Sequence, residues 1–226
     1  MRKELSEALE VDDVTQLPGY RPIGDWQQFG HGRINQLRAD LRGDNWQKFQ
    51  SDYILHHNLY GGTTVDDIRA IVESGGQMVP TMDKLRRGIL PKGMSPESDI
   101  RSGGGDYFFT RLRKRRELTS EVGLKWKVGH VARQDSISYP GDRYGNTSTT
   151  SKILKERGVT VGDYMRYEAG DRYNETIFKN GLSIYDDLLH IVARPADRRE
   201  IIAYLKTKFD RWPDGRRIAV SYTHLR

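Results

Sequence analysis

Residues 53–76 read YILHHNLYGGTTVDDIRAIVESGG, and this stretch decides the fold that the sequence predicts. β-Branched and aromatic residues fill most of its first eight positions, so we expect a strand over residues 53–60. A glycine pair then makes a sharp turn. Thr63 or Thr64 can cap the helix that follows, because two aspartates occupy its first turn, and a second glycine pair ends it. A strand, a turn and a helix in so short a stretch indicate a mixed α and β protein.

The rest of the chain extends this pattern. Residues 77–106 are rich in proline and glycine and predict loops. Further strands are expected over residues 107–112, within 122–139 and at 174–178, and a late helix over 196–206. A helix candidate lies at residues 34–50. We therefore expect an N-terminal helical extension, residues 1–51, followed by one domain, residues 52–226.

Composition excludes several classes of protein. The chain has 226 residues, of which 36% are hydrophobic and 30% charged, and its mean hydropathy is −0.74. It has no cysteine, which excludes disulfides, thiolate metal sites and a cysteine nucleophile. No apolar run approaches the about 18 residues of a membrane span, and the first residues lack the apolar segment of a secretory signal. The sequence thus predicts a cytoplasmic protein that does not enter a membrane.

Net charge points to an anionic partner. The chain carries 37 basic and 31 acidic residues, a net charge of +6, and its isoelectric point is about 9.4. A basic run occupies Arg113, Lys114, Arg115 and Arg116. It is either a solvated face or a strip that binds the phosphates of a nucleic acid.

Two other motifs could carry chemistry. The triplet Gly103-Gly104-Gly105 lies before a strand and not a helix, which argues against a dinucleotide fingerprint and against a P-loop. His56 and His57 are neighbours on a strand, so they point to opposite faces and cannot both hold one metal ion. We expect no metal site. One of these histidines can donate a hydrogen bond into a cleft; the other interpretation is a buried core histidine.

Glu175 begins the late strand, after the polar segment GDRYN. A carboxylate at the start of a strand can face a cleft, although a glutamate in such a place is commonly a surface residue. No other set of residues predicts a serine nucleophile or a kinase.

The order of three segments resembles the ADP-ribosyltransferase superfamily over roughly residues 52–194. These segments are LYGGTTVDDIRAIVESGG, then GMSPESDIRSGGGDYFFTRL, and then YNETIFKNGLSIYDDLLHIV. In that family the first strand carries His or Arg and is followed by a helix, a middle strand holds an aromatic or hydroxyl motif, and a late strand begins with the catalytic glutamate. The resemblance implies an α+β fold with a split, mostly antiparallel sheet and flanking helices.

The resemblance also implies roles for single residues. Glu175 matches the catalytic glutamate, whose charge would stabilise the cation that develops on the ribose when nicotinamide leaves. The other matches concern NAD, the implied co-substrate. His57 matches the NAD-contacting histidine, with His56 as the other register. The remaining NAD-binding candidates are Gly62, Thr63, Arg86, Tyr107, Phe109 and Thr110.

Two positions depart from the family pattern. Gly61 stands where many relatives have a histidine directly at the turn after the first strand. Tyr173 stands two residues before Glu175, where the arginine-modifying subtype has a glutamate, so modification of arginine is disfavoured.

The expected function is therefore mono-ADP-ribosyl transfer from NAD to a macromolecular acceptor, with DNA or RNA favoured over protein on charge. Two alternatives stay open: an RNA 2′-phosphotransferase-like enzyme, and a basic nucleic-acid-binding module without activity. The sequence also leaves open whether the protein is a toxin, a defence factor or a housekeeping enzyme. Whether it has an antitoxin or immunity partner is open as well.

Overall fold

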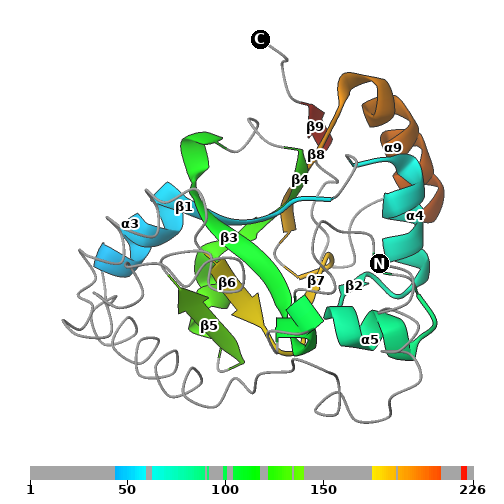
Figure 1. Cartoon of the computed structure of the whole chain (residues 1–226). Coiled ribbons are helices and arrows are strands. Elements are labelled where there is room, and N and C mark those ends of the chain that lie inside the picture. The colour runs from blue at the N-terminus through cyan, green and yellow to red at the C-terminus, as the bar shows by residue number, and fades with distance from the viewer. Residues whose placement is uncertain are drawn as a thin grey trace. The chain divides into compact units, whose positions relative to one another are not determined.

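The computed structural model consists of α-helices, short 3₁₀-helices and a mostly antiparallel sheet, an α+β fold (Figure 1). It describes residues 44–59, 63–89, 91, 99–100, 104–117, 122–133, 135–139, 175–186, 188–209 and 220–222. Most of the expected N-terminal extension and the polar segment before Glu175 lie outside these residues. The chain divides into two compact units.

The second unit, made of Gly43–Met78, Thr110–His130 and Leu182–Arg226, contains most of the sheet. Its strands lie in the order β3-β1-β4-β8-β9. All neighbouring pairs are antiparallel except β8 and β9, which are parallel. The bounds are β1 Tyr53–His57, β3 Phe108–Lys114, β4 Gly123–Lys127, β8 Leu188–Ala193 and β9 Val220–Tyr222, with β3 joining this unit at Thr110. Two short strands, β2 (Gln77–Met78) and β7 (Leu182–Ser183), form a separate antiparallel sheet of their own.

The central strand β1 confirms the strand expected at residues 53–60 but is shorter. Ile54 and Leu55 are completely buried, as is Trp126 on the neighbouring strand β4. The Trp126 indole Nε1 donates to the carbonyl oxygen of Ser183 at 2.8 Å, which satisfies the polar atom of this core residue.

Helix α4 (Val65–Glu73) begins where the sequence predicted. Thr64 is its N-cap: the Asp67 backbone N–H donates to the Thr64 hydroxyl, and the Thr64 N–H donates to the Asp67 carboxylate, each at 3.2 Å. The helix ends before Gly75 and Gly76, whose φ angles are +88° and +74°. Together these features confirm the predicted helix.

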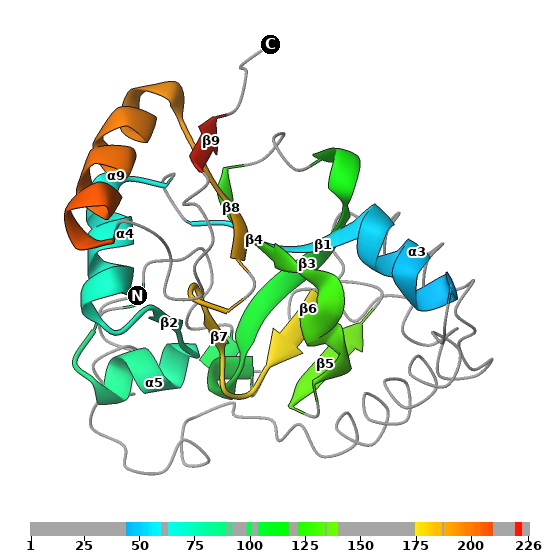
Figure 2. The same ribbon diagram turned by 180° about the vertical axis from the view of Figure 1, so that it is seen from behind.

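Helices α4 and α9 (Pro195–Lys208) lie side by side (Figures 1 and 2). Ile68 of α4 and Ile201 and Leu205 of α9 are completely buried, so the apolar faces of both helices contribute to the core. Helix α3 (Asp44–Asp52) leads directly into β1, and its Phe49 ring packs 5.2 Å from the Tyr53 ring.

The first unit includes Val79–Phe109 and Val131–Gly181. Here residues 77–106 differ from the expected loops, because α5 (Thr81–Arg86) is a short helix that follows Pro80. Met82 and Leu85, three residues apart, are buried and anchor it. The 3₁₀-helix η2 (Gly104–Asp106) packs against α5. A Cβ on Gly105 would lie 3.0 Å from the Met82 side chain, so this triplet glycine allows the close packing.

The first unit also contains an antiparallel strand pair, β5 (Ser136–Tyr139) and β6 (Glu175–Phe178). Two further 3₁₀-helices complete the described elements: η3 (Arg115–Glu117) follows β3, and η4 (Val128–Ala132) follows β4.

Candidate functional site

Glu175 is the first residue of strand β6, as the sequence predicted for that strand. Its backbone lies opposite Tyr139 of β5. Glu175 is half-buried, whereas the three residues that follow it on the strand are buried. Glu175 therefore lies where the strand enters the core of the first unit.

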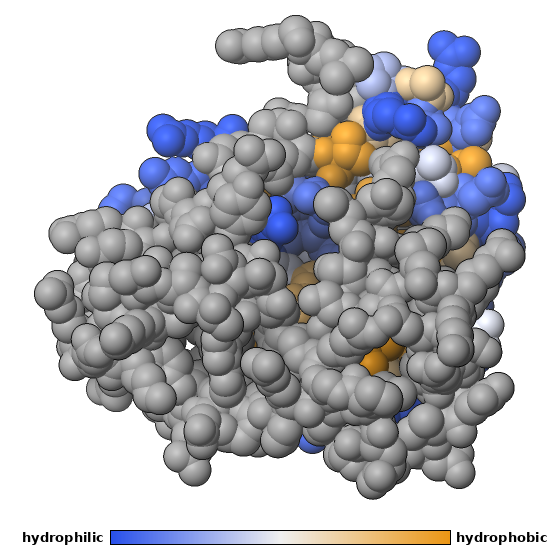
Figure 3. Space-filling model, in the orientation of Figure 1, coloured by the Kyte–Doolittle hydropathy of each residue, from blue (hydrophilic) through white to orange (hydrophobic). Residues whose placement is uncertain are grey.

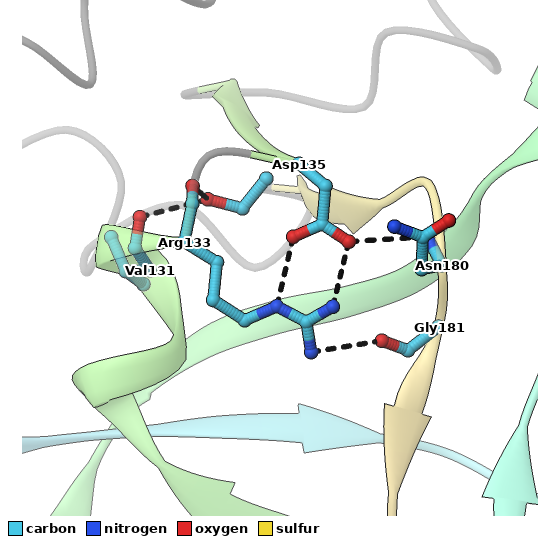
Figure 4. Close-up of polar contacts among 6 residues, drawn as sticks. Val131, Arg133, Asp135, Asn180 and Gly181 are labelled. Carbon is cyan, nitrogen blue, oxygen red and sulfur yellow. Dashed lines mark hydrogen bonds and ion pairs between the residues drawn. The ribbon is translucent and has the colours of Figure 1, made fainter.

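A salt bridge at the other end of this strand pair holds the pair in place (Figure 4). The Arg133 guanidinium donates twice to the Asp135 carboxylate, from Nε at 2.8 Å and from Nη2 at 2.6 Å. Arg133 Nη1 also donates to the carbonyl oxygen of Gly181, and the Asn180 backbone N–H donates to Asp135, each at 3.2 Å. The contacts of Arg133 and Asp135 thus join the start of β5 to the turn after β6.

Asp135 is held in its charged form by these contacts. Burial raises the pKa of its carboxyl, but the hydrogen bonds and charge of Arg133, with the Asn180 backbone N–H, outweigh burial and lower the pKa below its ordinary value. The Arg133 guanidinium also lies 5.4 Å from the centre of the Phe178 ring, which ties this pair to the buried end of β6.

The two histidines of β1 differ in their surroundings. His56 is buried, and its Nε2 lies 3.3 Å from the carbonyl oxygen of Val122. His57 is half-buried and points to the opposite face of the sheet. Of the two histidines, only His57 is partly exposed to solvent, and it is the last residue of the strand.

Gly123 lets strand β4 approach both histidines. Its φ angle is +145°, and a Cβ built on it would lie 2.2 Å from the His57 carbonyl oxygen and 2.8 Å from His56 Nε2. No side chain fits there, so glycine is required for the pairing of β1 with β4 at this point.

Thr63, predicted to contact NAD, is completely buried in the second unit directly before the cap of α4. Its hydroxyl oxygen is buried and has no hydrogen-bond partner in the described part of the chain. Gly62, which was also predicted to bind NAD, lies outside the described residues.

The aromatic and hydroxyl motif lies at the start of β3. Tyr107 and Thr110 are buried, and Phe109 between them is half-buried. The Tyr107 backbone N–H donates to the Gly104 carbonyl oxygen at 2.9 Å, which fixes the entry into the strand. Tyr107 and Phe109 belong to the first unit, and Thr110 begins the second unit's part of β3.

Arg86, the predicted partner of the pyrophosphate, is exposed at the end of α5 and already forms ion pairs. Its Nη1 lies 2.7 Å from Asp83, and its Nη2 lies 3.6 Å from Asp106. A phosphate would compete with these carboxylates. Nearby, burial lowers the pKa of Lys84, and the charge of Asp99 opposes that shift.

The basic run at residues 113–116 divides between two elements. Arg113 and Lys114 belong to β3, are half-buried and point to opposite faces, because side chains alternate along a strand. Arg115 and Arg116 belong to η3 and are exposed. The run therefore presents its charges in more than one direction.

A second set of basic residues, which come from separate segments of the sequence, crosses the sheet of the second unit. His56 lies opposite Arg111 of β3 on one side and opposite Lys125 of β4 on the other. Lys125 in turn lies opposite His190 of β8. Directly opposite residues share one face of a sheet, so these four form a row, which we call the basic row.

The inner members of the basic row are deeply buried. His56 and Lys125 are each 1% exposed, whereas Arg111 and His190, at the two ends, are half-buried. Burial lowers the pKa of His190, and the positive charges of Arg115 and Lys125 lower it further. Alternation along β3 predicts that Arg111 and Arg113 share a face, but the register between distant strands, which creates the row, has no signal in the sequence.

On the side drawn in Figure 3, most of the described residues at the surface are hydrophilic, and the apolar ones lie in small separate patches. In the part of the chain that the structure describes, no group of three histidine, aspartate or glutamate residues could bind a metal ion. Within the same residues, every helix is too short or too polar to span a membrane.

Comparisons of the chain with protein-family models, with curated proteins and with solved structures find no match in any of the three. The candidate site therefore rests on this chain's own residues. Glu175, Arg86, Tyr107 and Phe109 belong to the first unit, and His56, His57, Thr63 and Thr110 belong to the second.

Proposed function

We propose that this chain is a mono-ADP-ribosyltransferase that cleaves NAD at the nicotinamide–ribose bond and transfers ADP-ribose to a macromolecular acceptor, with nucleic acid favoured over protein. The observation that carries the proposal is the position of Glu175. It is the first, half-buried residue of a strand whose next three residues are buried.

The order of the elements along the chain supports this proposal. A strand that carries histidine, β1, is followed by helix α4; an aromatic and hydroxyl strand, β3, comes next; and the strand that begins with glutamate, β6, comes late. This is the order that the resemblance to ADP-ribosyltransferases implies, and the finer fold of that family is part of the proposal.

The chemistry assigned to Glu175 follows from the reaction. The bond between ribose C1′ and the nicotinamide nitrogen breaks, nicotinamide leaves with the electron pair, and positive charge develops on the ribose. A carboxylate stabilises that charge and can accept the proton of the attacking acceptor as the new bond to C1′ forms. His57 and Tyr107 are the proposed NAD contacts.

The test uses NAD labelled in its ADP-ribose part, with DNA, RNA and cell-lysate protein as three separate acceptor pools. We expect label on one pool, and a loss of about 10²- to 10⁴-fold in the Glu175→Gln variant. Glu200→Gln, which changes an exposed glutamate of α9 in the same way, is the matched control and should transfer label at the rate of the unaltered protein.

The same experiment separates the alternatives. Equal NAD turnover in both variants would contradict the role of Glu175. Consumption of NAD only with a 2′-phosphorylated RNA would favour the phosphotransferase. Binding of nucleic acid with no NAD turnover, and with an unchanged salt dependence in Glu175→Gln, would favour the binding module.

A further inference from the structure

The face of the strand pair on which Glu175 lies depends on how β6 pairs with β5. The two strands are antiparallel, and their register places Glu175 opposite Tyr139 and Phe178 opposite Ser136. Side chains alternate between the two faces of a strand, so a slip of one residue in this pairing would carry the Glu175 side chain to the other face. Any contact that fixes the register therefore also fixes the face that the carboxylate takes.

Two common sources of strand register are weak in this pair. A hairpin loop of about two to five residues fixes the register of the strands that it joins, but residues 140–174 lie between β5 and β6. A strand with one buried and one exposed face is also held in register by burial. On β6, however, Thr176, Ile177 and Phe178 are all buried, although consecutive residues face opposite sides. Burial therefore does not select one face of β6 for Glu175.

Contacts at the opposite end of the pair tie the segment before β5 to the residues after β6 (Figure 4). The Arg133 guanidinium donates to both carboxylate oxygens of Asp135, which directly precedes β5, and its Nη1 donates to the Gly181 carbonyl oxygen. Asp135 accepts the backbone N–H of Asn180 at its carboxylate and that of Lys179 at its carbonyl oxygen, at 3.2 and 3.0 Å. We call Arg133 and Asp135, with the backbone of Lys179, Asn180 and Gly181, the Arg133 clamp.

The Arg133 clamp fits only one register. A guanidinium and a carboxylate that share two hydrogen bonds meet in a fixed planar geometry, and both side chains are half-buried. After a slip of one residue, the Asn180 N–H and the Gly181 carbonyl oxygen would each move by about 3.3 Å, the rise per residue of a strand, and both hydrogen bonds would break. The Arg133 guanidinium also lies 5.4 Å from the ring of Phe178, the last residue of β6. The clamp therefore defines one position of β6 relative to the segment that precedes β5.

We propose that Arg133 and Asp135 are positioning residues for Glu175: the Arg133 clamp fixes the register of β5 and β6 and thereby holds the carboxylate on the face where NAD is cleaved. Both residues act through the strand pair and do not touch the substrate. The proposal rests on the proposed transferase function, to which it adds the residues that place the catalytic carboxylate. A displacement of about 1 Å in a catalytic group can lower the rate about 100-fold, so a loss of register should act mainly on the chemical step.

The first test measures the register without any substrate. The readouts are NMR contacts between backbone protons of Tyr139 and Glu175, and relaxation dispersion at the amides of residues 175–178. In Asp135→Asn we expect the contact between these two residues to weaken at least about twofold and dispersion to appear, because strands that change register exchange on a microsecond to millisecond timescale. An unchanged contact without dispersion in the folded variant would overturn the proposal.

Two further variants accompany this comparison. Arg133→Lys keeps the charge of the pair but cannot bond to Asp135 and Gly181 at once, so it should show the same change of register and tests the proposal even if Asp135→Asn does not fold. Asp66→Asn removes an ion pair of similar length with Arg69 at an exposed site, and it should leave the register as in the unaltered protein. Equal changes in Asp66→Asn would contradict a specific role of the clamp.

The second test measures NAD cleavage per folded molecule, with the folded fraction taken from circular dichroism at the assay temperature. Asp135→Asn should lower kcat by about 10- to 100-fold and change the KM for NAD by less than about threefold. Asp66→Asn should match the unaltered protein in both constants. A pair that only stabilises the fold would leave kcat per folded molecule unchanged, and that result would overturn the positioning role.

The two tests separate this proposal from the proposed function. Glu175→Gln should keep the register contact with Tyr139 while it loses NAD turnover, because the substitution changes the carboxylate and not the strand pair. If the unaltered protein does not cleave NAD, the proposed transferase fails, and the NMR comparison still decides whether the Arg133 clamp holds Glu175 in place. If NAD is cleaved and the register is the same in Asp135→Asn, only the positioning role fails.

Discussion

The two units place charged side chains differently. In the first unit, Arg133 and Asp135 neutralise each other, and the backbone of Asn180 and Gly181 satisfies further atoms of the pair. In the second unit, the strand register brings basic residues opposite one another in the basic row, which consists of Arg111, His56, Lys125 and His190.

This difference separates a local source of stability from a feature that depends on the whole sheet. A matched pair with short hydrogen bonds stabilises the fold by itself. The basic row exists only in one strand register, because a shift of one residue would send a side chain to the other face. We therefore assign stability to the Arg133–Asp135 pair and a dependence on strand register to the basic row, and three changes test this assignment.

The largest effect is expected from Gly123→Ala, which would break the strand register on which the basic row depends. The new Cβ would lie 2.2 Å from the His57 carbonyl oxygen, at a φ angle of +145° that a side chain rarely allows. Strain and overpacking together should lower the free energy of unfolding by about 3 kcal/mol or more, measured by urea denaturation.

Gly129→Ala is the control for that change. Among the residues that the structure describes, a Cβ on Gly129 would meet only the side chain of Gln50, at an ordinary distance of 3.6 Å. If both alanine variants unfolded at the same urea concentration, the close approach at Gly123 would not be a requirement of the fold.

A smaller effect is expected from Asp135→Asn, which removes the charge from the matched pair and keeps its shape. The Arg133 guanidinium would lose its bidentate partner, at a cost of about 1–3 kcal/mol in the free energy of unfolding. Asp66→Asn removes a comparable contact to Arg69 at an exposed site and should cost less than about 0.5 kcal/mol.

The same pair predicts a dependence on acid. The folded pKa of Asp135 lies below its ordinary value of 3.8, so its contribution is complete above that value and is lost as the pH falls through the folded pKa. The Asp135→Asn variant should lose less stability than the unaltered protein over this window. Parallel stability curves for the two proteins would contradict the assigned role.

The smallest effect is expected at His190. Its folded pKa lies below the ordinary value of 6.5, so its neutral form is favoured in the fold. The contribution is therefore complete above that value and is lost as the pH falls through the folded pKa, because the unfolded chain takes up the proton first. His190→Gln should flatten the slope of stability against pH there. A slope unaffected by this change would contradict a lowered pKa of His190 in the folded protein.

Local patterns predicted much of the fold. The strand at Tyr53, the cap at Thr64 and the strand that begins at Glu175 follow from side-chain types within a few residues of each other. Helix α5 was missed because the surrounding glycines and prolines indicate loops, and only the buried pair Met82 and Leu85 anchors it.

The basic row could not be predicted in the same way. Arg111, His56, Lys125 and His190 come from four strands, and a shift of one residue in any pairing would send a side chain to the other face. That register is set by packing, by the requirement for glycine at position 123 and by the bulge at Leu189, none of which leaves a pattern within one segment.

The position of β9 has a consequence for how the chain is made. This strand, Val220–Tyr222, lies parallel to β8. The other neighbour of β8 is β4, which begins at Gly123, almost a hundred residues before β9. During synthesis, β8 would leave the ribosome before β9 and would wait with one edge open until residues 220–222 emerged. The second unit can therefore complete its sheet only after β9 has been made, and a chain cut after α9 would keep an exposed edge to which other strands could add.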